Sequence, residues 1–247
     1  HANLENYCDK MVLTYGALEK DGRTVTYGGY STRITVDEQY VVRVPDEIPL
    51  DRAAPLLCAG ITTYSPLKHF GVKPGHHVAI VGLGGLGHMG VKLAKAMGAH
   101  VTVLSHSERK RDSALQLGAD DFVVTSGDGA FEKNQSKFDF ILDTVSAEHD
   151  YNSYVNLLKL DGTLCLVGVP PPSPLHAFPL IKARRSIMGS CIGGIAETQE
   201  MLDFCAKHNV AADIELIQIQ QINEAYERMM KGDVLYRFVI DAKSFEE

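Results

Sequence analysis

Glycines spaced to cradle a diphosphate stand out in the sequence, as Gly82-Leu83-Gly84-Gly85-Leu86-Gly87. An apolar β-rich run precedes them and helical spacing follows, which is the setting this pattern requires. Gly82 permits a tight turn, Gly84 lets the backbone approach the ligand, and Gly87 lets helix and strand pack closely. The helix start adds free N–H groups and a partial positive charge. The pattern indicates a dinucleotide site, with a structural glycine turn or an adenosylmethionine site as alternatives.

The end of the second predicted strand determines which dinucleotide the site selects, and the residues there are Ser105, His106, Ser107, Glu108, Arg109 and Lys110. NAD sites usually carry an acidic residue here for the ribose 2′-hydroxyl, and Ser105 occupies that place. A 2′-phosphate instead favours hydroxyl groups and cations, which the two serines, Arg109 and Lys110 supply. Glu108 argues against this unless its side chain points to solvent. The run therefore favours NADP(H); an exposed basic helix start is the alternative.

Composition excludes several classes of protein. The chain has 247 residues, 45% of them hydrophobic and 22% charged, an ordinary globular mix for one large or two modest domains. A net charge of −7 argues against nucleic-acid or anionic-membrane binding. The longest apolar run, residues 78–91, is too short for a membrane span and contains glycines. The 5 cysteines form no CxxC pair, so we expect no disulfide framework and a cytoplasmic location.

Alternating strands and helices must position these residues. The predicted strands are 77–82, 100–105, 121–125, 138–144 and 162–168, and the helices between them are 86–97, 108–117 and 151–160. Continuous apolar strands with short connections predict an α/β fold with a doubly wound parallel sheet. Residues 1–57 are rich in Gly, Tyr and β-branched residues and predict β structure. The last part predicts strands at 186–190, 214–219 and 237–241 and helices at 195–208 and 222–231.

Several blocks resemble one family in their order along the chain. They are Ala54–Leu67 (APLLCAGITTYSPL), residues 82–98 (GLGGLGHMGVKLAKAMG), Asp143-Thr144-Val145 and Arg237-Phe238-Val239. Together they are similar to the cinnamyl alcohol dehydrogenase branch of the zinc-dependent medium-chain alcohol dehydrogenases. The resemblance implies an NADP-binding Rossmann domain at 59–196. It would be inserted in a GroES-like, mainly β catalytic domain, formed by 1–58 and 197–247 and truncated in this chain.

The same resemblance implies reversible hydride transfer between NADP(H) and an aldehyde/alcohol pair, with zinc as Lewis acid. Cys58 matches a ligand of the catalytic zinc, although a cysteine among Leu, Ala and Gly is by itself typical of a small core residue. Cys8 matches a ligand of a structural zinc. His88 follows the glycine motif and is expected on a helix face rather than as a ligand. The implied cofactor contacts beyond the glycine turn are Thr62, Thr144, Gly168, Val169, Ser190, Ile192 and Arg237.

Two departures from the family bear on the substrate. Leu13 and Cys191 stand where lignin-pathway members carry aromatic residues, so the pocket of Leu13, Cys191 and Ile192 offers less surface to a phenylpropenyl ring. We therefore expect a reductase of allylic, terpenoid or simple aromatic aldehydes. A zinc-free NADPH reductase of enones, quinones or iminium carbons is an alternative. The family's other zinc ligands lie ahead of His1, so the chain alone is expected to be an inactive dinucleotide-binding fragment. A homodimer through an edge strand at Ile187–Gly193 rests on fold analogy.

Overall fold

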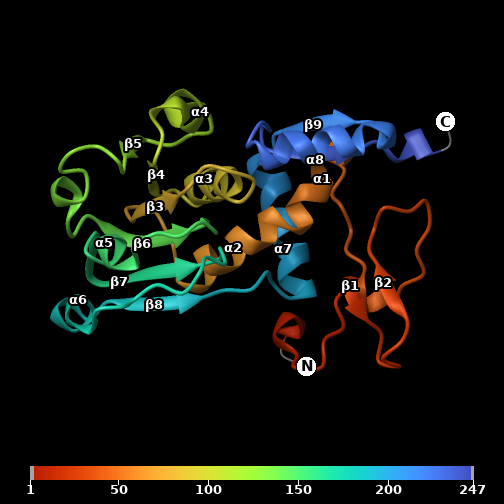
Figure 1. The fold of residues 1–247 in the computed structure, drawn as a ribbon, viewed down its shortest axis with the longest axis horizontal. Coiled ribbons are helices and arrows are strands. Elements are labelled where there is room, and N and C mark those ends of the chain that lie inside the picture. Colours follow the sequence, from red (N-terminus) through yellow and green to blue (C-terminus); the bar gives the residue numbers. More distant parts are fainter. Residues whose placement is uncertain (1–2, 246–247) are drawn as a thin grey trace.

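A six-stranded parallel sheet forms the centre of the computed structural model, which describes residues 3–245 (Figure 1). Its strands are β3 (His77–Val81), β4 (His100–Ser105), β5 (Asp121–Val124), β6 (Phe138–Asp143), β7 (Leu158–Leu166) and β8 (Ser186–Gly189). Their order is β5-β4-β3-β6-β7-β8. It reverses between β3 and β6, so the turns after these two strands face each other across the crevice where such sheets bind ligands.

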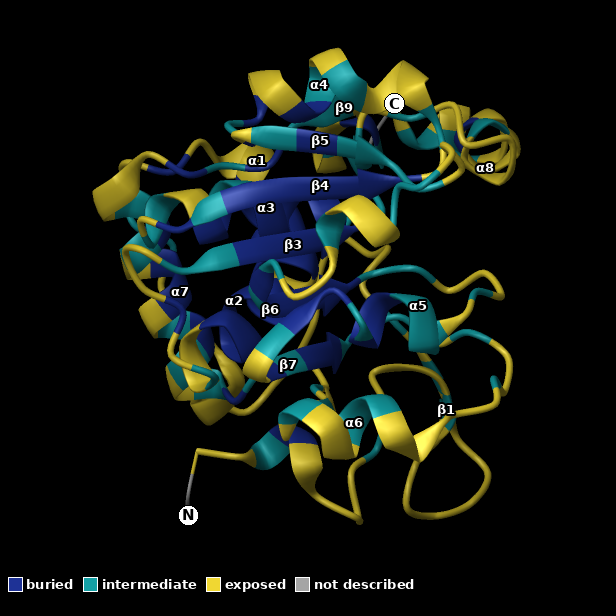
Figure 2. Ribbon diagram, turned by 90° about the vertical axis from the view of Figure 1, so that its left-hand side faces the viewer, coloured by how far each residue is buried: buried dark blue, intermediate teal, exposed yellow. Residues whose placement is uncertain are grey.

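Both faces of the sheet are covered, which confirms the predicted doubly wound architecture. The connecting helices are α3 (Gly87–Ala96), α4 (Arg111–Gln116), α5 (Tyr151–Val155) and α6 (Ala177–Ala183). Val78 and Ile80 pack into one apolar core, while Ala79 and Val81 belong to a second core that includes residues of α5. Alternate residues of one strand are thus buried on opposite faces, which explains the continuous apolar runs in the sequence (Figure 2).

Two further helices pack beside the sheet. Helix α2 (Ala59–His69) contacts both α3 and α7 (Ile195–His208). The sequence predicted α7 over its full length but did not predict α2. Helix α2 is buried from Ala59 through Leu67, so it has no amphipathic periodicity, and it contains Pro66.

The prediction for residues 151–160 was wrong in its second half. Helix α5 ends at Val155 and strand β7 begins at Leu158, because a short apolar run fits a helix and a buried strand equally well. Helix α6 was also missed, and Pro179 lies inside it. The carboxyl-terminal elements follow the prediction within a few residues, as β9 (Ile214–Ile217), α8 (Ile222–Met230) and β10 (Arg237–Ile240). Strands β9 and β10 pair in parallel as a separate small sheet.

The amino-terminal region differs most from expectation. Its regular strands are the short antiparallel pair β1 (Tyr15–Leu18) and β2 (Val25–Tyr27), followed by the short helix α1 (Leu50–Ala53) and 3₁₀ turns. Tyr15 and Tyr27 are 71% and 90% exposed, so few contacts order this region (Figure 2). The prediction of extensive β structure over 1–57 was therefore wrong for most of the described part, and the domain limits at 59 and 196 stay a prediction. Within residues 3–245, no helix is both long and apolar enough to cross a bilayer.

Candidate cofactor-binding site

The glycine turn follows β3 and opens α3. Gly82 has φ +84°, a conformation that favours glycine, and a Cβ there would lie 2.7 Å from Val145 Cγ2. A Cβ on Gly87 would lie 3.0 Å from the carbonyl carbon of Gly82. A Cβ on Gly84, in contrast, would meet no atom of the described part of the chain within 4 Å. Packing within the protein therefore requires glycine at Gly82 and Gly87, whereas Gly84 borders open space.

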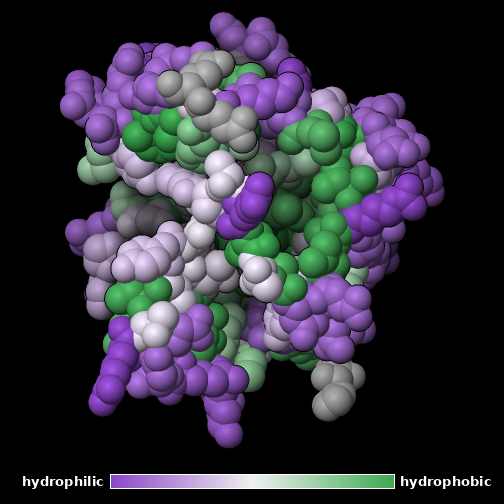
Figure 3. Space-filling view, turned by 90° about the vertical axis from the view of Figure 1, so that its right-hand side faces the viewer, coloured by the Kyte–Doolittle hydropathy of each residue, from purple (hydrophilic) through white to green (hydrophobic). Residues whose placement is uncertain are grey.

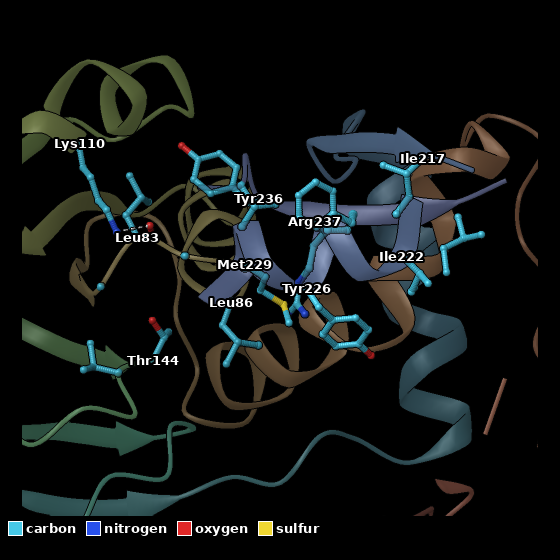
Figure 4. Close-up of a pocket in the computed structure, with 18 of the residues that line it drawn as sticks. Leu83, Leu86, Lys110, Thr144, Ile217, Ile222, Tyr226, Met229, Tyr236 and Arg237 are labelled. Carbon is cyan, nitrogen blue, oxygen red and sulfur yellow. Dashed lines mark hydrogen bonds between the residues drawn. The ribbon is translucent and has the colours of Figure 1, made fainter. Parts of the chain in front are cut away.

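That space is a cavity of about 600 Å³ between the glycine turn and the carboxyl-terminal elements. Thr144 and Val145 border it at the end of β6, and Tyr226, Met229 and Arg237 come from the carboxyl-terminal part of the chain (Figure 4). Hydrophobic side chains also gather on the face of the molecule that carries α8 (Figure 3). A largely apolar cleft with a few converging polar groups is typical of a cofactor site.

Arg237 connects the two sides of this cavity. Its guanidinium lies over the glycine turn, because a Cβ on Gly85 would be 2.7 Å from Arg237 Cζ (Figure 4). Its buried Nε has no hydrogen-bond partner among residues 3–245. A buried guanidinium nitrogen without a partner, next to the first turn of a helix, fits an anionic diphosphate. The residues present are therefore suited to a dinucleotide.

The run after β4 contributes a second polar cluster. Ser105 is buried, and its Oγ accepts a hydrogen bond from Ser107 N at 3.3 Å. Lys110 Nζ donates to the carbonyl of Leu83 at 3.0 Å, which brings its charge to the glycine turn (Figure 4). Burial, and then the nearby Arg109, lower the pKa of Lys110.

The remaining side chains of this run are exposed. Arg109 Nε lies 3.4 Å from Ser107 Oγ, and His106 contributes its backbone carbonyl to a bond with Ser126 Oγ at 3.1 Å. Glu108 pairs with Arg111, with 3.1 Å between Arg111 Nη2 and Glu108 Oε2. The one acidic residue of the run is thus held by a neighbouring cation.

The turn after β6 is fixed by bonds that the sequence did not reveal. Thr144 Oγ1 donates to the carbonyl of Val81 at 2.7 Å, which ties the end of β6 to the end of β3. The Asp143 carboxylate is buried; it accepts from Val145 N at 3.0 Å and lies 2.6 Å from His149 Nε2. Burial raises the pKa of Asp143. This pair holds the turn opposite Gly82. In the sequence, His149 was only a polar residue six positions downstream.

His88 lies on α3 and is buried. Its ring stacks on Tyr236 with 4.7 Å between centroids and 7° between planes. Burial, and then Lys92, lower the pKa of His88 to about 4. The neutral ring therefore packs the first turn of α3 against the residue that precedes Arg237.

The other predicted cofactor residues lie at three places. A Cβ on Gly168 would be 2.7 Å from the carbonyl carbon of Val145, so the chain after β7 packs directly on the β6 turn. Val169 is 85% exposed. Ser190 N donates to Leu166 O at 3.1 Å at the end of β8. Ile192 has φ +42°. The lining of the cavity contains neither Thr62, which is buried in α2, nor Leu13, Cys191, Ser190 or Ile192.

Cys58 and Cys8 are both exposed. Cys58 stands between a 3₁₀ turn (Ala54–Leu57) and α2, and its carbonyl accepts from Thr62 N at 3.1 Å. Among residues 3–245, no three His, Cys, Asp or Glu side chains come together in a way that could hold a metal. The described residues therefore do not complete a zinc site around either cysteine, and zinc binding stays a prediction.

Several known proteins are similar to this chain in sequence and fold. Residues 85–207 match the model of the zinc-binding dehydrogenase family. NADP-dependent alcohol dehydrogenase C 1 of Mycolicibacterium smegmatis is 58% identical over 98% of this chain and 70% of its own length. A cinnamyl alcohol dehydrogenase of Sorghum bicolor aligns with TM-score 0.93 and 47% identity, over 97% of this chain and 69% of that one. The crystal structure of CAD from Helicobacter pylori in complex with NADP(H) aligns with TM-score 0.88 and 44% identity, over 97% of this chain and 69% of that one.

Family model, sequence identity and fold agree with one another, and they agree with the glycine turn at the point where the strand order reverses. The chain spans about 70% of the length of its curated relative. It belongs to the medium-chain alcohol dehydrogenase family, in the branch that resembles the cinnamyl alcohol dehydrogenases.

Proposed function

We propose that this chain is the NADP(H)-binding part of an alcohol dehydrogenase that acts as an aldehyde reductase. The observation that carries the proposal is the cavity at the glycine turn, where Arg237 and Lys110 converge from distant parts of the chain. The name of the Mycolicibacterium relative and the NADP(H) complex of the Helicobacter structure support the choice of cofactor. When bound, NADPH would supply a hydride to the aldehyde carbon and become NADP⁺, and a proton from solvent on the oxygen would complete the primary alcohol.

Different residues of the site bind different parts of the cofactor. The N–H groups that begin α3 and the Arg237 guanidinium bind the diphosphate, and Gly84 leaves room for it. Ser105, Ser107 and Lys110 hold the 2′-phosphate, which gives preference for NADP over NAD. Thr144 and Val145 border the cavity opposite the glycine turn. Ser190 and Ile192 contact the nicotinamide end.

Zinc is part of the proposal through Cys58, whose thiolate would be one ligand. One thiolate is too few to hold a metal, and the described residues add no other ligands to it. We therefore propose that the chain of 247 residues binds NADP(H) without turning over substrate. The absence of aromatic rings at Leu13 and Cys191 favours allylic, terpenoid or simple aromatic aldehydes over lignin precursors. Strand β8 lies at the sheet edge and would pair with a second copy to form a homodimer.

A titration of the chain with NADPH and NADH, followed by the fluorescence of the nicotinamide, tests the cofactor. We expect NADPH to bind at least about tenfold more tightly, which corresponds to one charge-assisted hydrogen bond. Equal dissociation constants would refute the assignment of the 2′-phosphate site. Zinc analysis and an NADPH-linked panel of aldehydes and enones test the rest. Enone reduction by metal-free protein would favour the zinc-free alternative, and aldehyde reduction by this chain would refute the proposed inactivity.

A further inference from the structure

The amino-terminal 3₁₀ turn, Glu5–Tyr7, lies against the loop between β8 and α7 and forms hydrogen bonds with it (Figure 1). Asn6 is 7% exposed, and its Nδ2 donates to the carbonyl of Cys191 at 2.6 Å. The Tyr7 hydroxyl accepts from Cys191 N at 3.4 Å, and Glu5 Oε2 accepts from Ile195 N at 3.2 Å. Three consecutive side chains thus bind the backbone of one distant loop.

The loop they hold has a strained backbone. Ile192 has φ +42°, which is rare for a β-branched residue. Such conformations persist only where the surroundings impose them, and they concentrate at ligand sites. The neighbouring positions leave no room, because a Cβ on Gly193 would lie 2.6 Å from Ile61 Cδ1 and one on Gly194 would lie 2.7 Å from Glu5 Oε2. The contacts with Glu5 and Asn6 therefore fix the conformation of this loop.

We propose that Asn6, supported by Glu5 and Tyr7, is a positioning residue for the nicotinamide end of the cofactor site. It holds the Cys191 peptide, and through it the left-handed Ile192, in the arrangement that contacts the nicotinamide. Asn6 itself does not touch the cofactor. The inference rests on the proposed function, because that function places Ser190 and Ile192 along the nicotinamide.

A purely structural role for the turn makes a different prediction. The bond from Ile195 N to Glu5 satisfies a free donor at the start of α7 and would stabilise that helix whatever the loop does. The Asn6 bond acts on the peptide directly before Ile192. Loss of a helix cap would lower overall stability and weaken every part of the cofactor site alike. Loss of loop positioning would weaken the nicotinamide end alone.

Comparing the affinities for NADP⁺ and for 2′,5′-ADP, which lacks the nicotinamide, distinguishes the structural role from the positioning role. Asn6→Asp keeps the side-chain shape but replaces the donor with an oxygen that faces the Cys191 carbonyl. We expect a five- to tenfold weaker affinity for NADP⁺, roughly the loss of one hydrogen bond, and an affinity for 2′,5′-ADP within about twofold of the wild type. Asn134→Asp is the matched control, since Asn134 Nδ2 also donates to a backbone carbonyl, that of Ala130 at 2.8 Å. Asn134 lies shortly before the start of β6, at the amino ends of the strands, whereas the cofactor cavity lies at their carboxyl ends, so this variant should change neither affinity.

Thermal melting of each variant shows whether it folds. If Asn6→Asp does not fold, Tyr7→Phe decides, because it removes only the acceptor of Cys191 N and should weaken NADP⁺ selectively by a smaller factor. An unchanged NADP⁺ affinity in the folded variant, or an equal loss for both ligands, overturns the inference. A wild-type chain that binds neither ligand overturns the proposed function itself and is recognised before any variant is compared.

Discussion

Replacement of Lys110 by methionine should change the cofactor preference of the protein. The lysine brings the positive charge of the run after β4 to the glycine turn, with Nζ 3.0 Å from the carbonyl of Leu83. Methionine keeps an unbranched side chain of comparable size but removes the charge and the donors. The variant therefore tests whether this ammonium group binds the 2′-phosphate.

The size of the effect follows from two contributions. A hydrogen bond to a charged group is worth about 1.5–3 kcal/mol, or roughly 13- to 160-fold in affinity. The bond to Leu83 is lost for NADH and NADPH alike, so it cancels in the ratio of their dissociation constants. Arg109 remains beside the site, close to Ser107, and retains part of the phosphate attraction. We therefore expect the ratio to fall by about 15-fold, near the lower end of that range.

The assay is a titration of both reduced cofactors at fixed salt concentration, because screening weakens contacts between charges. The chain contains no tryptophan (Trp 0), so protein emission interferes little with nicotinamide fluorescence. Lys133→Met is the control, since Lys133 Nζ also lies near a backbone carbonyl, that of Asp128 at 3.4 Å, and is exposed. Equal weakening of NADPH and NADH by Lys110→Met would refute the role of Lys110 in selecting the phosphate.

Three further predictions concern the turn, its packing and the assembly. Gly84→Ala should fold with an unchanged melting temperature but bind NADP⁺ at least tenfold more weakly, because its Cβ enters the open space proposed for the cofactor. Gly87→Ala should lower the melting temperature, because its Cβ would collide with the backbone of Gly82. A lower melting temperature for Gly84→Ala than for Gly87→Ala would refute these roles. The pKa of His88 is lowered from 6.5 to about 4, so the stability it contributes is present above pH 6.5 and is lost as the pH falls toward 4. His88→Phe keeps a ring against Tyr236, so between about pH 7.5 and pH 5 its free energy of unfolding should fall by about 2 kcal/mol less than that of the wild type. Urea unfolding at several pH values measures this difference, and parallel plots of unfolding free energy against pH would contradict it. Met188→Lys places a charge on the 45% exposed edge-strand residue and should convert a dimer into a monomer in light scattering, whereas an unchanged mass would argue against pairing through β8.

The sequence was most informative where structure is local. The run 78–81 is apolar without interruption and the run 101–104 is nearly so, as is typical of strands buried on both faces. The glycine turn and the serine and lysine run each lie within consecutive residues, so spacing alone indicated where each would lie relative to its strand and helix, while their roles stay predictions. Lys110 and Leu83 come together because both segments follow neighbouring strands of the sheet.

Periodicity failed where the environment is uniform or the signal is ambiguous. Helix α2 is buried nearly all round and has no polar stripe, whereas residues 158–160 fit a helix as well as the strand they form. The residues of 1–57 have β-forming types, yet a strand also needs a partner. Val41, for example, is extended and 59% exposed.

Long-range pairs in the site could not be predicted from the sequence. Arg237 was placed near the diphosphate only through family resemblance, and no pattern indicated that it would lie over Gly85. The pairs of Asp143 with His149 and of His88 with Tyr236 depend on how the β6 turn and the carboxyl-terminal strand pack. Such contacts are set by tertiary structure, and residue types alone do not specify them.

The hydrogen bond between Asn6 and Cys191 also has a consequence for the order of assembly, because its partners are 185 residues apart. During synthesis at about 5–20 residues per second, Asn6 is made roughly 10–40 s before its acceptor exists. The glycine turn is synthesised within that interval, and Arg237 is synthesised after Cys191. The contacts of Asn6 with the loop before α7 can therefore form only after the sheet strands β3 to β8 have been synthesised.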